Sequence, residues 1–87
     1  MFTVIFGRAD CAFCVRAQEL AQRLQEGRDD FQFRYIDIYK EGITRADMEK
    51  TIGKPVETVP QIFVDEMHVG GFTEFSEYVR SHLSVPN

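Results

Sequence analysis

Hydrophobic and polar residues alternate along the chain in segments that predict strands and helices. Residues 2–6 are apolar on both faces except at Thr3, as expected for a buried central strand. Residues 31–38 alternate apolar and polar positions and predict a second strand. Between them, residues 11–25 carry apolar side chains at helical spacing along one face. This order predicts a βαβ unit with parallel strands and a right-handed crossover.

Capping residues and glycines indicate where the first two helices begin and end. Asp10 is the expected N-cap of the first helix, and Gly27 marks its end. Thr44 and Asp47 have the spacing of a weak capping box. They predict a second, shorter helix that extends to about Ile52.

The last third of the chain predicts a hairpin followed by a helix. Residues 61–64 and 67–69 are two apolar segments separated by an acidic pair, the pattern of a β-hairpin. Gly70 and Gly71 end the hairpin. Thr73 is expected to cap a final helix, whose apolar side chains recur at helical spacing.

Length and composition place these elements in one small domain. Residues 1–87 are expected to form a single α/β domain of order β-α-β-α-β-β-α, a four-stranded mixed sheet with three helices and a frayed tail at 84–87. A hydrophobic content of 44% with eight Phe is enough for a core. The net charge of −4 argues against a general nucleic-acid binder. No membrane span or signal peptide is predicted, so the expected compartment is the cytoplasm.

The only two cysteines, Cys11 and Cys14, carry the candidate chemistry. They are three residues apart at the predicted start of the first helix, where free N–H groups and the helix dipole favour a thiolate at Cys11. Cys14 lies one turn further in, and burial is expected to raise the pKa of its thiol. We therefore predict that Cys11 attacks a disulfide and that Cys14 resolves the mixed disulfide. Arg8 and Arg16 flank the pair; they either favour the thiolate or are solvated surface charges.

Other interpretations of the cysteine pair remain open at this point. An inert disulfide closing so short a loop would add little stability. Zinc needs about four ligands, and His68 and His82 do not have the spacing of a zinc finger. A non-catalytic binding module with this fold would keep its partner affinity after alkylation of Cys11. Thiol–disulfide chemistry is the favoured hypothesis because a C-x-x-C motif opens a helix of a βαβ unit.

Residues 58–60, Thr-Val-Pro, precede the third predicted strand. A trans proline here would mark only the start of the strand. A cis Val59-Pro60 bond would leave the Val59 N–H and C=O free to pair with an extended thiol substrate. The residues alone do not decide between the two isomers.

The glycine pair before the last helix has two interpretations as well. Gly70 and Gly71 could form only a tight turn. Alternatively, the N–H groups of Thr73 and Glu74 at the helix start could hold a carboxylate, because glycine allows a ligand to approach closely.

Together, the segments Cys11-Ala-Phe-Cys14, Thr58-Val-Pro60 and Gly70-Gly-Phe-Thr73 resemble glutaredoxins. The run 53–65 resembles the bacterial dithiol glutaredoxin 1 type in particular, and the resemblance covers essentially the whole chain. It implies a thioredoxin fold with a cis Pro60. It also implies a glutathione-dependent thiol–disulfide oxidoreductase that acts on protein disulfides and glutathione mixed disulfides, with an expected potential of about −200 to −230 mV. Glutathione and ribonucleotide reductase are the implied partners of a monomer without a bound cofactor or metal.

The resemblance also implies a glutathione site. Cys11 would bond to the glutathione sulfur, and Val59 would pair with the glutathione backbone. The amides of Thr73 and Glu74 would bind the γ-glutamyl carboxylate, and Arg8 would lie near the glycyl carboxylate. The complete expected set of glutathione-binding residues is Arg8, Phe13, Thr58, Val59, Pro60, Gly71, Phe72, Thr73 and Glu74.

Three positions depart from the usual family pattern. Ala12 and Phe13 replace proline and tyrosine of the motif, and Glu74 replaces aspartate. Ala12 keeps its N–H and a freer φ, so the redox potential need not follow the family norm. Some glutaredoxins without the motif proline hold a [2Fe–2S] cluster between two subunits with two glutathiones, and this is an alternative additional activity.

Overall fold

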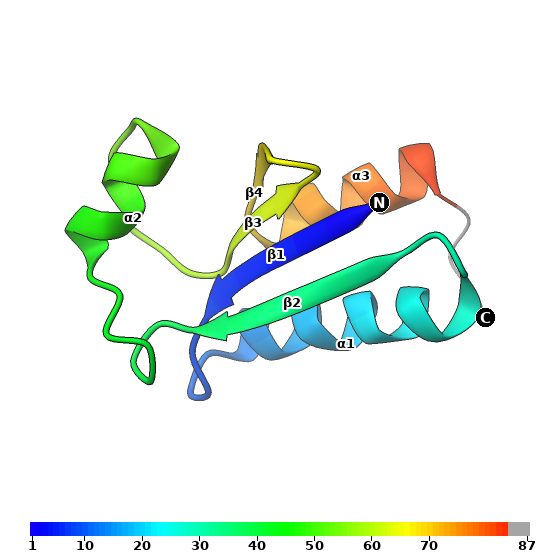
Figure 1. The fold of residues 1–87 in the computed structure, drawn as a ribbon, viewed down its shortest axis with the longest axis horizontal. Coiled ribbons are helices and arrows are strands. Elements are labelled where there is room, and N and C mark those ends of the chain that lie inside the picture. The colour runs from blue at the N-terminus through cyan, green and yellow to red at the C-terminus, as the bar shows by residue number, and fades with distance from the viewer. Residues whose placement is uncertain (84–87) are drawn as a thin grey trace.

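The computed structural model describes residues 1–83 and contains four strands and three helices (Figure 1). The expected tail at 84–87 lies outside the described residues. The elements follow the predicted β-α-β-α-β-β-α order: β1 (Phe2–Gly7), α1 (Ala12–Gly27), β2 (Gln32–Asp37), α2 (Arg45–Ile52), β3 (Gln61–Val64), β4 (Met67–Gly70) and α3 (Phe72–His82).

The strands form one mixed sheet in the order β2-β1-β3-β4. β1 and β2 are parallel, with Ile5 opposite Tyr35, and β3 is antiparallel to both β1 and β4. The expectation of a four-stranded mixed sheet is confirmed. Because β1 lies between β2 and β3, the loop after β1 leads from the middle of the sheet into α1.

The main core lies between one face of the sheet and helices α1 and α3. Its buried side chains come from alternate strand positions, from one face of each helix and, at Phe31, from the residue before β2: Ile5, Ala17, Ala21, Leu24, Phe31, Ile62, Val64, Phe75 and Val79. A smaller cluster of Ile38, Met48 and Val56 attaches α2 to the end of the sheet, which is where Figure 1 shows this helix. The larger cluster anchors both helices whose N-termini carry the candidate site residues.

Two predicted helix starts are wrong by one or two residues. The N-cap of α1 is Cys11 and not Asp10, because the Cys11 backbone is extended and its Sγ accepts the Cys14 N–H. The N-cap of α3 is Gly71 and not Thr73, which lies inside the first turn. In both cases a candidate functional residue, Cys11 or Gly71, is the N-cap of the helix.

The remaining helix ends agree more closely with the sequence. The capping box of Thr44 and Asp47 is confirmed, and Gly53 ends α2 with φ +84°, the left-handed conformation that glycine favours. Gly27 is the last residue of α1, but its C-cap is an extended Arg28. No helix among residues 1–83 has the length and apolar character needed to cross a membrane.

Candidate active site

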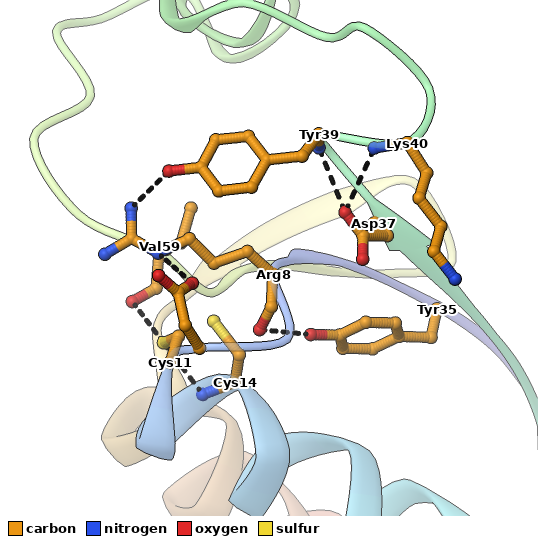
Figure 2. A network of polar contacts seen from close by, with 9 residues as sticks. Arg8, Cys11, Cys14, Tyr35, Asp37, Tyr39, Lys40 and Val59 are labelled. Carbon is orange, nitrogen blue, oxygen red and sulfur yellow. Dashed lines mark hydrogen bonds and ion pairs between the residues drawn. The ribbon is translucent and has the colours of Figure 1, made fainter.

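Cys11 lies at the N-cap of α1, where the chain leaves the middle of the sheet. The Cys14 amide donates to its Sγ at 3.2 Å, and the Cys11 thiol donates to the Val59 carbonyl at 3.6 Å (Figure 2). The side chain is partly exposed. An N–H donor and a helix N-terminus both stabilise negative charge on this sulfur, so Cys11 has the surroundings of a nucleophilic thiol.

Cys14 lies one turn into the same helix and is fully buried. Burial, and after it the neighbouring Cys11 side chain, raise the pKa of its thiol to about 12, whereas the Arg8 backbone amide acts in the opposite direction. The two cysteines therefore differ in access to solvent as the sequence predicted. Cys11 can meet a substrate sulfur, and Cys14 can be reached only from within the protein.

Gly7 and Tyr35 enclose Cys14 from the side of the sheet. A Cβ atom placed on Gly7 would lie 2.5 Å from Tyr35 Oη and 3.0 Å from Cys14 Sγ, so only glycine fits without movement of these groups. The Tyr35 hydroxyl donates to the Arg8 carbonyl at 3.2 Å. No motif in the sequence pointed to either residue. The parallel pairing of β1 with β2 could have suggested Tyr35, but its approach to Cys14 depends on how α1 packs.

The Arg8 side chain extends away from the cysteines towards Tyr39 (Figure 2). Its Nη1 donates to the Tyr39 hydroxyl at 3.5 Å, and its Nε lies 3.1 Å from Asp10 Oδ1. Both partners are exposed, so a ligand carboxylate can compete for the guanidinium. Arg16, the second predicted flanking cation, instead lies over the Phe13 ring at 5.3 Å.

The Val59-Pro60 peptide bond is cis, which confirms what the family resemblance implied and decides between the two isomers that the residues alone left open. Pro60 is buried, whereas Thr58 is exposed. Gln61 links residues 58–60 to β4. Its Nε2 donates to the Thr58 carbonyl at 2.8 Å, and its Oε1 lies 2.7 Å from His68 Nε2. Among residues 1–83, the Val59 amide has no hydrogen-bond acceptor.

The glycine pair brings the start of α3 beside this segment. A Cβ on Gly71 would be in ordinary contact, 3.6 Å, with the Pro60 carbonyl. Gly70 has φ +118°, a conformation that side chains rarely adopt. The Glu74 carboxylate turns back and accepts the Gly71 N–H at 2.8 Å. Gly70 and Gly71 therefore form both a turn and a close contact with the cis-proline segment.

Phe13 and Phe72 form an aromatic pair beside Cys11. Their ring centroids are 6.3 Å apart, and Phe13 is 53% exposed although it is large and apolar. An apolar ring is therefore available at the surface next to Cys11. The pair lies on the first turns of α1 and α3, so it spans the two helix termini of the site.

A groove of about 440 Å³ extends from Arg8 and Val59 to residues of α2. Arg8, Tyr39, Thr58 and Val59 are among the residues that line it, and the Val59 carbonyl accepts from the Cys11 thiol. Neither cysteine lines this groove or a larger hollow of about 710 Å³, whose wall includes Phe2, Phe6 and Phe63. We place the substrate groove at the smaller hollow because Val59, which contacts the Cys11 sulfur, lies in its wall. No group of three or more His, Cys, Asp or Glu side chains that could hold a metal occurs within residues 1–83.

Comparisons with known proteins agree with this geometry. The glutaredoxin family model matches residues 3–69. Glutaredoxin 1 of Salmonella typhimurium is 64% identical over 85 residues, 98% of each chain. The structure of reduced Escherichia coli glutaredoxin superimposes with a TM-score of 0.87 at 57% identity, covering 94% of this chain and 96% of that one. A buckwheat glutaredoxin–glutathione complex has a TM-score of 0.67 at 25% identity, covering 91% and 68%.

Proposed function

Since the chain belongs to the glutaredoxin family and is a glutathione-dependent disulfide oxidoreductase with a Cys11/Cys14 dithiol, we propose how its residues divide this work. Cys11 is the nucleophile, and Cys14 is the resolving thiol. The observation that carries this division is the contrast between Cys11, a partly exposed helix cap that accepts an N–H, and Cys14, which is fully buried. Substrates are protein disulfides and glutathione mixed disulfides.

In the first step, the Cys11 thiolate attacks one sulfur of a substrate disulfide. A new S–S bond forms between Cys11 and that sulfur, the substrate S–S bond breaks, and the other substrate sulfur leaves as a thiolate that takes up a proton. The Cys14 amide stabilises Cys11 before the attack, because its N–H points at Sγ at 3.2 Å. The Val59 carbonyl, 3.6 Å from the same sulfur, marks the side on which the substrate chain is proposed to lie.

In the second step, Cys14 loses its proton and attacks the Cys11 sulfur. The bond between Cys11 and the substrate breaks, the second substrate thiol is released, and a Cys11–Cys14 disulfide remains. The raised pKa of Cys14, about 12, keeps this thiol protonated until the mixed disulfide has formed. When Cys11 is bonded to glutathione, a second glutathione can attack this mixed disulfide and free Cys11, so Cys14 is not required.

Two glutathiones then restore the dithiol. The first attacks Cys11, which leaves glutathione bonded to Cys11 and Cys14 as a thiol. The second attacks the glutathione sulfur of that mixed disulfide and leaves as glutathione disulfide. In sum, one protein disulfide and two glutathiones become one protein dithiol and one glutathione disulfide. The cycle requires a compartment rich in reduced glutathione, so we infer the cytoplasm.

We infer that glutathione lies along residues 58–60 and the start of α3. The unpartnered Val59 amide supports pairing with the glutathione backbone. The first-turn amides of Thr73 and Glu74 lack intrahelical acceptors and can bind the γ-glutamyl carboxylate. Arg8, at the mouth of the groove, supports binding of the glycyl carboxylate. The remaining members of the proposed set are Phe13, Thr58, Pro60, Gly71 and Phe72.

Ribonucleotide reductase is a proposed protein substrate of the monomer. Its support is the resemblance of residues 53–65 to the bacterial dithiol glutaredoxins, together with the exposed Phe13 beside Cys11, which offers a surface for a protein partner. An assay that couples nucleotide reduction to glutathione through this chain tests the pairing. Failure to support turnover, when a small mixed disulfide is still reduced, would limit the protein to other substrates.

Two cysteine variants test the proposed roles. Cys11→Ser should lose reduction of both a small glutathione mixed disulfide and a protein disulfide, because no nucleophile remains. Cys14→Ser should keep the first activity and lose the second. Full activity of Cys11→Ser, or undiminished protein-disulfide reduction by Cys14→Ser, would overturn the scheme.

The cluster-bridged dimer remains a prediction that rests on Ala12 alone. Anaerobic reconstitution with iron, sulfide and glutathione should then give a coloured dimer, and Ala12→Pro should reduce its yield. A colourless monomer after reconstitution would exclude this additional activity.

A further inference from the structure

Tyr35 lies at the inner end of the dithiol site, and the scheme above gives it no role. It belongs to β2, opposite Ile5 of β1, and it is only partly exposed. Its hydroxyl donates to the Arg8 carbonyl at 3.2 Å, and Figure 2 shows the phenol entering the site from the side opposite Val59. This hydrogen bond fixes the hydroxyl beside the residue that follows β1.

Gly7 allows the Tyr35 hydroxyl and the Cys14 thiol to lie against the same backbone atom. A Cβ on Gly7 would come within 2.5 Å of Tyr35 Oη and within 3.0 Å of both Cβ and Sγ of Cys14. The phenol and the thiol thus share the space that a side chain at position 7 would occupy. Tyr35 therefore places a hydroxyl group beside the Cys14 thiol, on the side of Gly7.

The resolving step creates a negative charge on the Cys14 sulfur, which is shielded from solvent. Cys14 has no exposed surface, and a buried thiolate is costly unless a donor faces it. The Arg8 amide already favours the charged form of Cys14. Burial and the negative charge of Cys14 and Cys11 raise the pKa of Tyr35 to about 12, so the phenol keeps its proton while a thiolate forms.

We propose that Tyr35 is a positioning residue for the resolving cysteine. Anchored beside Gly7, the phenol directs the Cys14 side chain towards Cys11. As Cys14 gives up its proton to the substrate thiolate released in the first step, the Tyr35 hydroxyl turns from the Arg8 carbonyl to the Cys14 sulfur and stabilises the thiolate. Tyr35 neither gains nor loses a proton in this step. The inference rests on Cys14 acting as the resolving thiol in the proposed function.

Tyr35→Phe tests the inference, because it removes only the hydroxyl. Reduction of a protein disulfide, which needs Cys14, should fall about tenfold at neutral pH, the value of one hydrogen bond to a charged group. The pH at which this activity reaches half of its maximum should rise, and intact-mass analysis should show more mixed disulfide on Cys11. Tyr78→Phe is the matched control, since Tyr78 stacks on His82 at the far part of α3.

A double-mutant comparison separates this role from a general effect on the fold. In the Cys14→Ser background, Tyr35→Phe should not change reduction of a small glutathione mixed disulfide, because the residue it serves is gone. A loss that persists in that background, or a pH profile of Tyr35→Phe equal to that of Tyr78→Phe, would overturn the inference. Retained protein-disulfide reduction by Cys14→Ser alone would overturn the dithiol scheme itself and leave Tyr35 without this role.

Discussion

The Gly71 amide donates a 2.8 Å hydrogen bond to the carboxylate of Glu74, three residues later in the chain. Gly71 is the N-cap of α3 and has no side chain with which to cap the helix. Glu74 therefore provides half of a capping box, and its negative charge faces the positive end of the helix dipole. The same carboxylate lies beside Gly70, where a Cβ would approach it to 2.9 Å.

Glu74→Ala should lower the free energy of unfolding by about 1 kcal/mol, because both the capping bond and the favourable charge are lost. Glu74→Gln should lower the free energy of unfolding by less, since its side-chain oxygen can still accept the Gly71 N–H. Urea unfolding of each variant measures the difference. Glu77→Ala, an exposed site on the same helix, is the control and should have little effect. Equal losses at positions 74 and 77 would contradict the capping role.

Thr73→Pro should raise the KM for glutathione about tenfold. Proline in the first turn of a helix removes the Thr73 N–H, a proposed donor to the γ-glutamyl carboxylate, without removing an intrahelical hydrogen bond. Thr73→Ala keeps this N–H and should retain a KM close to that of the parent. The experiment measures KM and kcat with a small mixed disulfide. If both variants behave alike, the carboxylate does not bind at this amide.

Thr3→Val should stabilise the protein by about 1–2 kcal/mol. Thr3 has no exposed surface, and its Oγ1 has no hydrogen-bond partner among the described residues. Valine keeps the shape and removes the unsatisfied hydroxyl. Thr3→Ser keeps the hydroxyl and deletes the methyl group, so it should destabilise by about 1 kcal/mol. Thermal unfolding of the two variants should therefore shift in opposite directions.

Glu66→Gly should stabilise the β3–β4 turn by about 1 kcal/mol, because Glu66 has φ +71° and carries a side chain in the left-handed region. Asp65→Gly is the matched comparison, since Asp65 has φ +48°. Its Oδ1, however, accepts the Phe2 N–H at 2.8 Å, and this bond would be lost. Chemical denaturation should show a gain only for Glu66→Gly. A similar gain for both would mean that the Asp65 bond contributes nothing.

Under reducing conditions, the protein should lose stability as the pH rises from about 9 towards 12. The pKa of Cys14 rises from 9.0 unfolded to about 12 folded, and that of Tyr35 from 10.0 to about 12. In this window the native state holds more protons than the unfolded chain, so the stabilisation present below pH 9 is lost as the thiol ionises. The slope for Cys14 is at most about 1.4 kcal/mol per pH unit.

Denaturant titrations across that pH window measure the effect. Tyr35→Phe and Cys14→Ser should each flatten the decline, because each variant removes one of the two groups. If stability decreases as steeply in both variants as in the parent, the loss of stability at alkaline pH is due to other residues.

Local patterns in the sequence were sufficient for most of the elements. Alternation and helical periodicity predicted the strands and helices, and the Thr44–Asp47 box lies where its spacing indicated. The two wrong caps, Asp10 and Thr73, have the same cause. Both side chains favour capping in isolation, but another side chain of the local sequence, Cys11 Sγ in α1 and the Glu74 carboxylate in α3, makes the capping hydrogen bond instead.

The features of the site also fall into two groups, those set by local sequence and those set by tertiary packing. By itself the sequence determined the dithiol motif, the burial difference between Cys11 and Cys14, and the element order, because these depend on spacing along one helix or strand. Only the tertiary structure decided the approach of Tyr35 to Cys14 across Gly7 and the cis isomer of Val59-Pro60, which the family resemblance implied but the residues by themselves left open. These features depend on packing between segments far apart in the chain, and no local periodicity encodes that packing.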